Sequence, residues 1–252
     1  RPPGSTLFPY TTLFRSFVRL KTLRPEFAHD AIAIREFLEE AKTAGRLNHP
    51  NVIRVHEVGG SEGGYFYSTE YIDGYSLQVL LKKLDRHRLP IRAACHHFAQ
   101  LFEALDYGVR NDVIHKEIRP KNIFIGKNNV CKIAGLGLVR DERLRFKKGH
   151  NPHFVAPEQV EGKAPDFRTD MFCMGAVMYY SLTGERPFEG RNANEILQRR
   201  LIQKPVPIGE LLPGAPPAIE CVVSILMSRN RADRPDSRQE IARELERMAD
   251  GD

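Results

Sequence analysis

The sequence predicts an α+β fold, with a small, mainly β portion first and a larger, mainly helical portion after it. Short runs rich in β-branched and aromatic residues, at 17–23, 52–58 and 65–70, indicate strands in the first portion. Apolar residues then recur at helical spacing, most clearly over 91–110 and 166–184. Because 41% of the 252 residues are hydrophobic, the chain can bury a substantial core, as one large domain or as two lobes.

Composition argues against several classes of protein. No apolar run reaches the roughly 20 residues that a membrane-spanning helix needs, and the nearest, at 171–184, is typical of a buried helix. The start of the chain has no signal-peptide pattern, so a cytoplasmic location is expected. The widely spaced cysteines form no Cys-x-x-Cys pair and are interpreted as reduced core thiols. They are Cys95, Cys131, Cys173 and Cys221.

The formal net charge of +6 raises the question of a nucleic-acid partner. The basic residues are scattered, however, and the one dense cluster, at 143–148, contains a single aromatic, Phe146. A solvated basic loop is the favoured interpretation, and docking of an acidic partner is the alternative. We therefore expect no binding of nucleic acid.

The N-terminal elements begin after an anomalous segment. Residues 1–16 fit poorly with the rest of the chain and resemble translated sequencing-adapter sequence, so the segment is expected to be non-native or disordered. A strand is predicted over 17–23. Asp30 can cap a helix that runs to Arg46, whose apolar residues lie at helical spacing.

The remaining elements are predicted from the same signals. Strands at 52–58 and 65–70 flank a glycine-rich turn at 59–64 and complete a small sheet. The chain shows no internal repeat and no second domain. Helices are predicted at 76–87, 91–110, 166–184, 192–201, 217–227 and 237–248.

A polar loop in the centre of the chain carries the residues with the clearest chemistry. His115, Glu117, Arg119 and Asn122 lie between two short β-branched runs, and a polar turn at 126–129 comes next. The stretch resembles the catalytic and metal-binding loops of the bacterial eukaryotic-type (Hanks-type) Ser/Thr protein kinases, which read His-Arg-Asp-Leu-Lys-Pro-Glu-Asn and Asp-Phe-Gly. Further motifs occur in the family's order: Leu-Asn-His-Pro-Asn-Val at 47–52, Ala-Pro-Glu at 156–158 and Arg-Ala-Asp-Arg-Pro at 231–235.

The resemblance covers about residues 17–249 and implies a two-lobed kinase-like fold, with an N-lobe at 17–72 and a C-lobe at 73–249. The N-lobe would be truncated, because the glycine-rich loop of the family is missing. The resemblance makes Asp170 a support for the catalytic loop and pairs Glu158 with Arg234 in a buried salt bridge.

The resemblance also assigns a site. It pairs Lys21 with Glu40, and it places Thr69 at the back of the adenine pocket and Glu70 at the hinge between lobes. It implies catalytic roles for Glu117, Arg119 and Asn122, with Asn122 also as a metal ligand. The implied cofactor-binding residues are Lys21, Glu40, Thr69, Glu70, Ile72 and Phe124.

Two positions depart from the family pattern. Glu117 stands where the family has its catalytic Asp, and Gly135 stands where it has the metal-binding Asp. ATP stays a candidate ligand, whereas Gly135 argues against Mg²⁺. The segment at 138–158 contains no Ser, Thr or Tyr, which argues against the usual activation by phosphorylation.

These departures leave three hypotheses. The first is a pseudokinase that works through protein partners as a signalling scaffold or allosteric partner, with weak or no phosphotransfer. The second is a weakly active or unconventional ATP-dependent Ser/Thr kinase that uses Glu117 and Asn122 as its metal site and Lys21 on the phosphates. The third is a purely structural remnant that binds no nucleotide.

Overall fold

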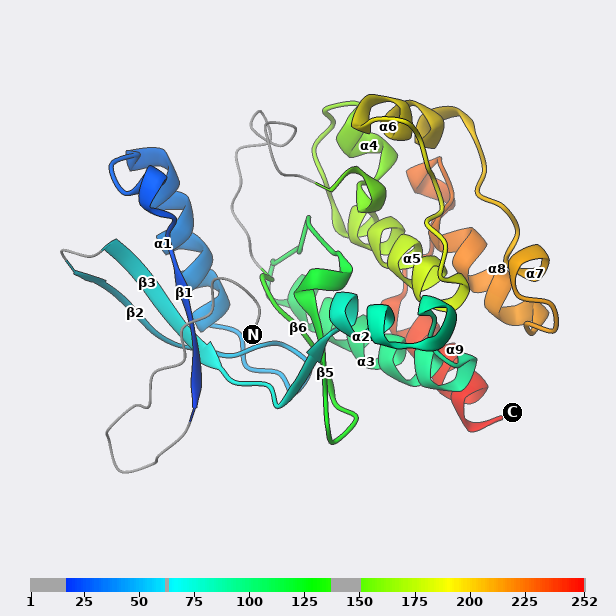
Figure 1. Ribbon diagram of the computed structural model, residues 1–252, viewed down its shortest axis with the longest axis horizontal. Coiled ribbons are helices and arrows are strands. Elements are labelled where there is room, and N and C mark those ends of the chain that lie inside the picture. Colours follow the sequence, from blue (N-terminus) through cyan, green and yellow to red (C-terminus); the bar gives the residue numbers. More distant parts are fainter. Residues whose placement is uncertain (1–16, 62–63, 137–150, 252) are drawn as a thin grey trace.

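The chain folds into two lobes, described by a computed structural model over residues 17–61, 64–136 and 151–251. A small β-sheet lobe with one long helix lies on one side, and a larger helical lobe lies on the other (Figure 1). The predicted α+β, two-lobed fold is confirmed. The segment 1–16 and the basic cluster at 143–148 lie outside the described residues.

The sheet of the small lobe has the order β1-β3-β2, with all neighbours antiparallel. Its strands are β1 (Val18–Thr22), β2 (Val55–Ser61) and β3 (Gly64–Glu70). The turn predicted at 59–64 is wrong, because β2 continues to Ser61 and β3 starts at Gly64. A Cβ at Gly59 would come within 2.6 Å of the Phe66 ring, so the glycine makes room for an aromatic side chain across the strands.

The second strand also begins later than predicted. Val52 and Ile53 are buried and bond to the other lobe instead: Val52 bridges Ile133, and Ile53 N–H donates to Ile133 O at 2.9 Å. Two residues that look like the start of a strand therefore tie the lobes together.

The helix α1 (Ala31–Gly45) packs against this sheet. Asp30 caps it as predicted, since its carboxylate accepts hydrogen bonds from the backbone N–H groups of Ile32 and Ala33. Among the described residues, the core of this lobe is small and consists of five buried residues. They are Phe37, Ala41, Ala44, Val55 and Tyr67.

A second antiparallel sheet of order β4-β5-β6 lies at the base of the helical lobe. Its strands are β4 (Gly74–Ser76), β5 (Ile123–Gly126) and β6 (Cys131–Ile133). The strand β4 was not predicted, because three residues are too few for a periodic pattern. Gly74 is required there, since a Cβ would collide with the carbonyl oxygen of Ile125.

The helices of the large lobe lie close to their predicted positions. The helix predicted at 76–87 ends early, because Arg86 and His87 have positive φ angles of 50° and 56°. The short helices α4 and α7 were not predicted. The described helices of this lobe are α2 (Leu77–Lys83), α3 (Ile91–Arg110), α4 (Pro157–Val160), α5 (Phe167–Thr183), α6 (Ala193–Ile202), α7 (Ile208–Leu211), α8 (Pro217–Leu226) and α9 (Arg238–Asp250).

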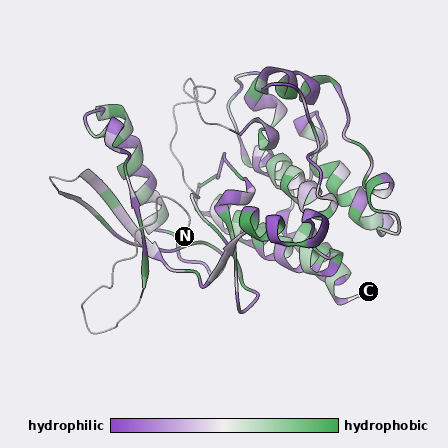
Figure 2. Cartoon of the chain, viewed as in Figure 1, coloured by the Kyte–Doolittle hydropathy of each residue, from purple (hydrophilic) through white to green (hydrophobic). Residues whose placement is uncertain are grey.

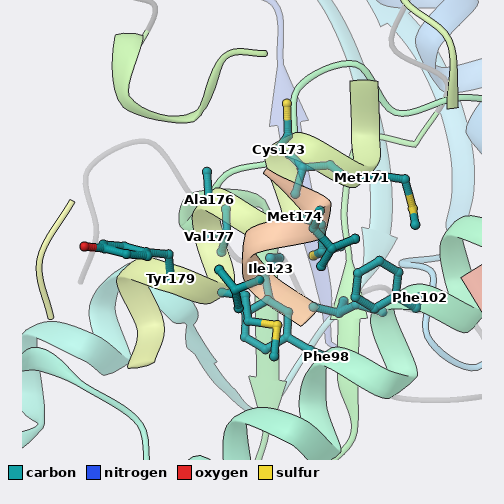
Figure 3. Close-up of a cluster of buried hydrophobic side chains, with 14 of the residues drawn as sticks. Phe98, Phe102, Ile123, Met171, Cys173, Met174, Ala176, Val177 and Tyr179 are labelled. Carbon is teal, nitrogen blue, oxygen red and sulfur yellow. The ribbon is translucent and has the colours of Figure 1, made fainter. Parts of the chain in front are cut away.

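Helix α5 lies at the centre of the large core. Its methionines pack with Phe98 and Phe102 of α3 and with Ile123 of β5 (Figure 3). Hydropathy follows this arrangement: α5 is mostly hydrophobic, whereas α9 shows alternating hydrophobic and hydrophilic faces (Figure 2). None of the helices that the structure describes is long and apolar enough to cross a membrane.

The cysteines differ from the prediction at one position. Cys95, Cys131 and Cys173 are buried free thiols, as predicted. Cys221 is exposed, because it lies on α8 beside the buried residues Val222 and Val223 and points away from the core.

Candidate functional site

The central loop, residues 115–122, is held from below by a buried carboxylate. Asp170 of α5 accepts hydrogen bonds from the backbone N–H of His115 at 2.6 Å and of Lys116 at 2.7 Å. Burial raises the pKa of this carboxyl, and His115 and the two donors oppose that effect. The supporting role that the resemblance assigned to Asp170 therefore matches the geometry.

His115 is fully buried beneath the loop. Its Nδ1 accepts a hydrogen bond from Glu117 N–H at 3.3 Å, so its Nε2 carries the proton and donates to Ala134 O at 3.0 Å. The ring thereby joins the loop to the segment that leads into Gly135.

Lys116 adopts a left-handed backbone conformation, with φ at 66°, which costs a residue with a Cβ roughly 1–2 kcal/mol. Its N–H is bonded to Asp170, and its carbonyl accepts from Gln159 Nε2 at 3.0 Å. Both of its backbone groups are therefore fixed by the large lobe, which keeps the loop in this conformation.

The predicted salt bridge between Glu158 and Arg234 is present and almost fully buried. The guanidinium donates to both carboxylate oxygens, at 2.7 and 2.9 Å, and Thr169 donates to the same carboxylate at 2.8 Å. Burial by itself raises the pKa of Glu158, but the hydrogen bonds and charge of Arg234 outweigh it and hold the pKa below its ordinary value. The pair anchors α4 beside the loop.

Glu117, Arg119 and Asn122 lie together in the loop. Arg119 Nη2 is 3.3 Å from Glu117 Oε1, and Asn122 Nδ2 donates to Glu117 O at 3.0 Å. A small pocket beside Glu117 and Arg119 is also lined by Asn151 and Phe154. The carboxylate in the catalytic position is thus engaged with a cation of its own loop.

Gly135 contributes no ligand atom. Its φ of 84° lies in the left-handed region, where glycine is favoured. Among the residues that the structure describes, no cluster of three His, Cys, Asp or Glu side chains could hold a metal ion. Mg²⁺ prefers carboxylate and phosphate oxygens, and Gly135 supplies neither.

The predicted pair of Lys21 and Glu40 is formed across β1 and α1. Lys21 Nζ lies 2.6 Å from Glu40 Oε1 and 2.6 Å from the hydroxyl of Tyr67, which donates to the same carboxylate at 2.7 Å. Tyr67 was missed by sequence reasoning. The antiparallel register, which places Lys21 opposite Tyr67, could have identified it.

The residues expected at the hinge are partly engaged with protein groups. Thr69 is buried and donates to Glu70 O at 3.3 Å. The carboxylate of Glu70 accepts from Lys132 Nζ at 2.8 and 2.9 Å and from Arg54 N–H at 2.9 Å. The Glu70 side chain therefore connects β3 to β6. Ile72 is half-buried next to Gly126.

Phe124 contacts an arginine that sequence reasoning did not select. The guanidinium carbon of Arg19 lies 5.0 Å from the centroid of the Phe124 ring, a cation–π distance. Arg19 lies opposite Thr69 in the sheet, and burial lowers its pKa. Arg19 thus lies between two residues to which the resemblance assigned cofactor contacts.

Comparison with known proteins places this geometry in a family. A sequence model described as "Protein kinase domain" matches residues 13–244. Serine/threonine-protein kinase pkn3 of Myxococcus xanthus is 32% identical over 249 residues, which cover 91% of this chain and 44% of that protein. Serine/threonine-protein kinase PknB of Mycolicibacterium smegmatis is 29% identical over 248 residues, with coverages of 93% and 39%. The chain thus spans less than half the length of these relatives.

A solved structure shows the same fold. The crystal structure of the PknI kinase domain of Mycobacterium tuberculosis, a point mutant, superposes with a TM-score of 0.73 and 22% sequence identity. The alignment covers 99% of this chain and 96% of that chain. At this identity the similarity shows the fold alone.

Proposed function

We propose, from the premise that this chain belongs to the protein kinase domain family, that it is a pseudokinase with weak or no phosphotransfer. Members of this family generally use ATP and Mg²⁺, and phosphoryl transfer relies on metal ions to neutralise the charge that develops on the phosphates. The observation that carries the proposal is Gly135, which leaves the family's main metal-binding position without a ligand atom.

Glu117 supports the same proposal. It keeps a carboxylate at the catalytic position, but it is one methylene longer than Asp and its Oε1 lies 3.3 Å from Arg119. A displacement of about 1 Å in a catalytic group can cost ~100-fold in rate. A base that is displaced and paired with a cation is poorly suited to accept a proton from a hydroxyl substrate.

The protein would then act through its surfaces, as a signalling scaffold or allosteric partner of other proteins. The loop is still fixed by Asp170, and the Glu158–Arg234 pair is intact, so the shape of the domain is retained. We also propose a cytoplasmic location, where the buried thiols Cys95, Cys131 and Cys173 stay reduced.

A weakly active kinase is the second proposal, and one observation favours it. The ion pair of Lys21 and Glu40, which active members of the family need, is formed at 2.6 Å. In this alternative, Glu117 and Asn122 hold the metal ion and Lys21 contacts the phosphates.

Transfer of labelled phosphate from ATP to a generic Ser/Thr substrate separates the two proposals, with Mg²⁺ or Mn²⁺ present and Lys21→Ala as the background control. We expect no transfer above that control. Transfer at ordinary kinase rates that Lys21→Ala abolishes would overturn the pseudokinase proposal. The double substitution Glu117→Asp and Gly135→Asp tests its cause: transfer that appears only in this variant identifies these two positions as the origin of the defect.

A further inference from the structure

Strand β1 carries two basic side chains, one of which reaches the large lobe. Arg19 and Lys21 are two residues apart on one strand, so they extend from the same face of the sheet. Arg19 contacts Phe124 of β5, and Lys21 contacts Glu40 and Tyr67. We call this region, between β1 and residues 119–124, the lobe junction.

Two more cations enter the lobe junction from the central loop. Burial lowers the pKa of Lys121, and the positive charges of Arg119, Arg19 and Lys21 lower it further, against the opposing effect of Glu117. Arg119, Arg19 and Lys21 thus each lie close enough to Lys121 to disfavour its charged form. Strand β1 and the central loop, which are about 100 residues apart in the sequence, thus bring their positive charges close together.

Only part of this charge is compensated. Lys21 pairs with Glu40, and Arg119 pairs with Glu117. In the part of the chain that the structure describes, no carboxylate lies within ion-pair distance of Arg19 or Lys121. Gly135 adds no negative charge nearby.

The contact between Arg19 and Phe124 determines what else can bind there. The guanidinium of Arg19 lies over the ring of Phe124, a residue that the resemblance assigned to cofactor binding, and so covers a ring face on which a purine base could stack. A base must displace Arg19 and leave this partly buried cation without its aromatic partner. A phosphate chain, in contrast, can bind the N–H groups of the half-buried guanidinium by charge-assisted hydrogen bonds.

We propose that the lobe junction binds an oligophosphate chain directly on Arg19, Lys21 and Lys121, without a divalent metal ion and without selectivity for a base. The inference deepens the proposed function and rests on it, because a site that holds phosphates on side-chain cations has no need of the missing metal ligand. The phosphate chain can belong to a nucleoside triphosphate or to inorganic tripolyphosphate.

Isothermal titration calorimetry in EDTA tests the inference with ATP, GTP, tripolyphosphate and adenosine at one fixed ionic strength. We expect the three phosphate compounds to bind with dissociation constants within about threefold of one another, and adenosine not to bind, because charged contacts supply the affinity. Binding without metal should be at least as tight as with Mg²⁺, which reduces the charge of the phosphate chain.

Three results would overturn the inference: a clear preference of the protein for ATP over tripolyphosphate, binding that is tighter with Mg²⁺ than in EDTA, or no binding of any phosphate compound. Inhibition by salt alone would not distinguish this site from general attraction to a basic protein, so variants are required.

The variants Arg19→Met and Lys121→Met keep a long apolar side chain and remove the charge. Each should weaken binding of tripolyphosphate roughly tenfold, the effect of losing one charge-assisted contact. Lys204→Met, at an exposed lysine between α6 and α7, is the matched control and should change nothing. Equal losses in all three variants would contradict a specific site.

Arg19→Met makes a second, opposite prediction. Once the guanidinium leaves Phe124, a purine base can stack there, so ATP should bind more tightly than tripolyphosphate in this variant. Thermal unfolding shows whether the variant is folded, and Arg19→Gln repeats the test with a polar side chain. Unchanged base selectivity in both folded variants would show that Arg19 does not exclude the base.

The calorimetric test of this inference and the labelling test of the pseudokinase proposal can fail independently of each other. Phosphate transfer in the labelling assay would overturn the pseudokinase proposal and would leave the calorimetric comparison of ATP with tripolyphosphate to be judged by itself. Selective, magnesium-dependent binding of ATP would overturn the present inference even where no phosphate is transferred.

Discussion

The support beneath the central loop, formed by Asp170, Glu158 and Arg234, and the lobe junction above the loop differ in how their charges are paired. Below the loop, each charged group has a partner: Asp170 accepts two backbone hydrogen bonds, and Glu158 holds Arg234 through both of its oxygens. Above it, Arg19 contacts an aromatic ring, and Lys121 lies near three cations and one carboxylate, that of Glu117. The charges of the support are paired, whereas the lobe junction has an excess of positive charge.

This difference teaches that the shape of a catalytic loop and its chemistry depend on different residues. The backbone conformation at His115 and Lys116 is fixed by Asp170 and Gln159 of the large lobe. The residue at 135 can therefore differ from the family pattern while the loop keeps its conformation.

The largest effect should follow from removal of Arg234. Arg234→Leu leaves the buried carboxylate of Glu158 without its cation, which should lower the free energy of unfolding by about 3–5 kcal/mol. Urea denaturation followed by circular dichroism measures this change.

Arg231→Leu is the matched control for that experiment, because its pair with Asp166 is partly exposed and 3.4 Å long. It should cost less than about 1 kcal/mol. Similar losses for the two arginines would show that the support below the loop does not depend on its buried ion pair, and the contrast between the two regions would fail.

An effect of intermediate size is expected from His97, a buried side chain of α3 in which one ring nitrogen lacks a hydrogen-bond partner in the described part of the chain. Burial, together with the neighbouring His96, lowers its pKa to about 4, and its Nδ1 has no hydrogen-bond partner among the described residues. The folded state therefore holds it neutral, and the unfolded state binds the proton more readily.

His97 should leave the free energy of unfolding unchanged above its ordinary pKa of about 6.5. As the pH falls toward about 4, the unfolded state takes up the proton first, and the free energy of unfolding should decrease. The full loss corresponds to about 3 kcal/mol in the free energy of unfolding. Unfolding by urea at a series of pH values measures it, and His97→Gln should flatten the curve over this range. The exposed His29, changed to Gln, should leave the slope unchanged. An equally steep curve for His97→Gln would rule out His97 as its origin.

The smallest effect on stability should come from Lys21, in the lobe junction. Its side chain is 48% exposed and the buried Glu40 keeps its hydrogen bond from Tyr67, so Lys21→Met should change the free energy of unfolding by less than about 1 kcal/mol. The same variant should weaken binding of tripolyphosphate roughly tenfold, because one charged contact is lost. Calorimetry and urea denaturation of one preparation give both numbers.

That combination would sharpen the contrast, since a residue of the lobe junction would matter for binding and little for folding. A loss of stability as large as that of Arg234→Leu, or unchanged binding, would contradict it.

Much of the fold was predictable because local sequence patterns specify its elements. The cap at Asp30, the bounds of the helix at 91–110 and the long buried helix at 166–184 follow from capping residues and apolar periodicity. The ordered motifs also located the pair of Lys21 with Glu40 and that of Glu158 with Arg234. The loss of a ligand at Gly135 needs no structure at all, because glycine has no side chain.

The errors share a physical cause, which is that neighbours in space were unknown. The turn at 59–64 was misplaced because glycine usually interrupts a strand, whereas here it admits the ring of Phe66. Val52 resembled a strand residue, but it bonds to the large lobe. Cys221 was predicted to be buried like its apolar neighbours on α8, but it is exposed.

By itself the sequence determined the family and the order of the elements, because each depends on residue type and spacing along one chain. Only the tertiary structure decided which side chains meet. It placed Tyr67 between Lys21 and Glu40, and it set Arg19 of one lobe on Phe124 of the other. Contacts of this kind depend on the packing of two lobes across about 100 residues of chain, and no local pattern encodes that packing.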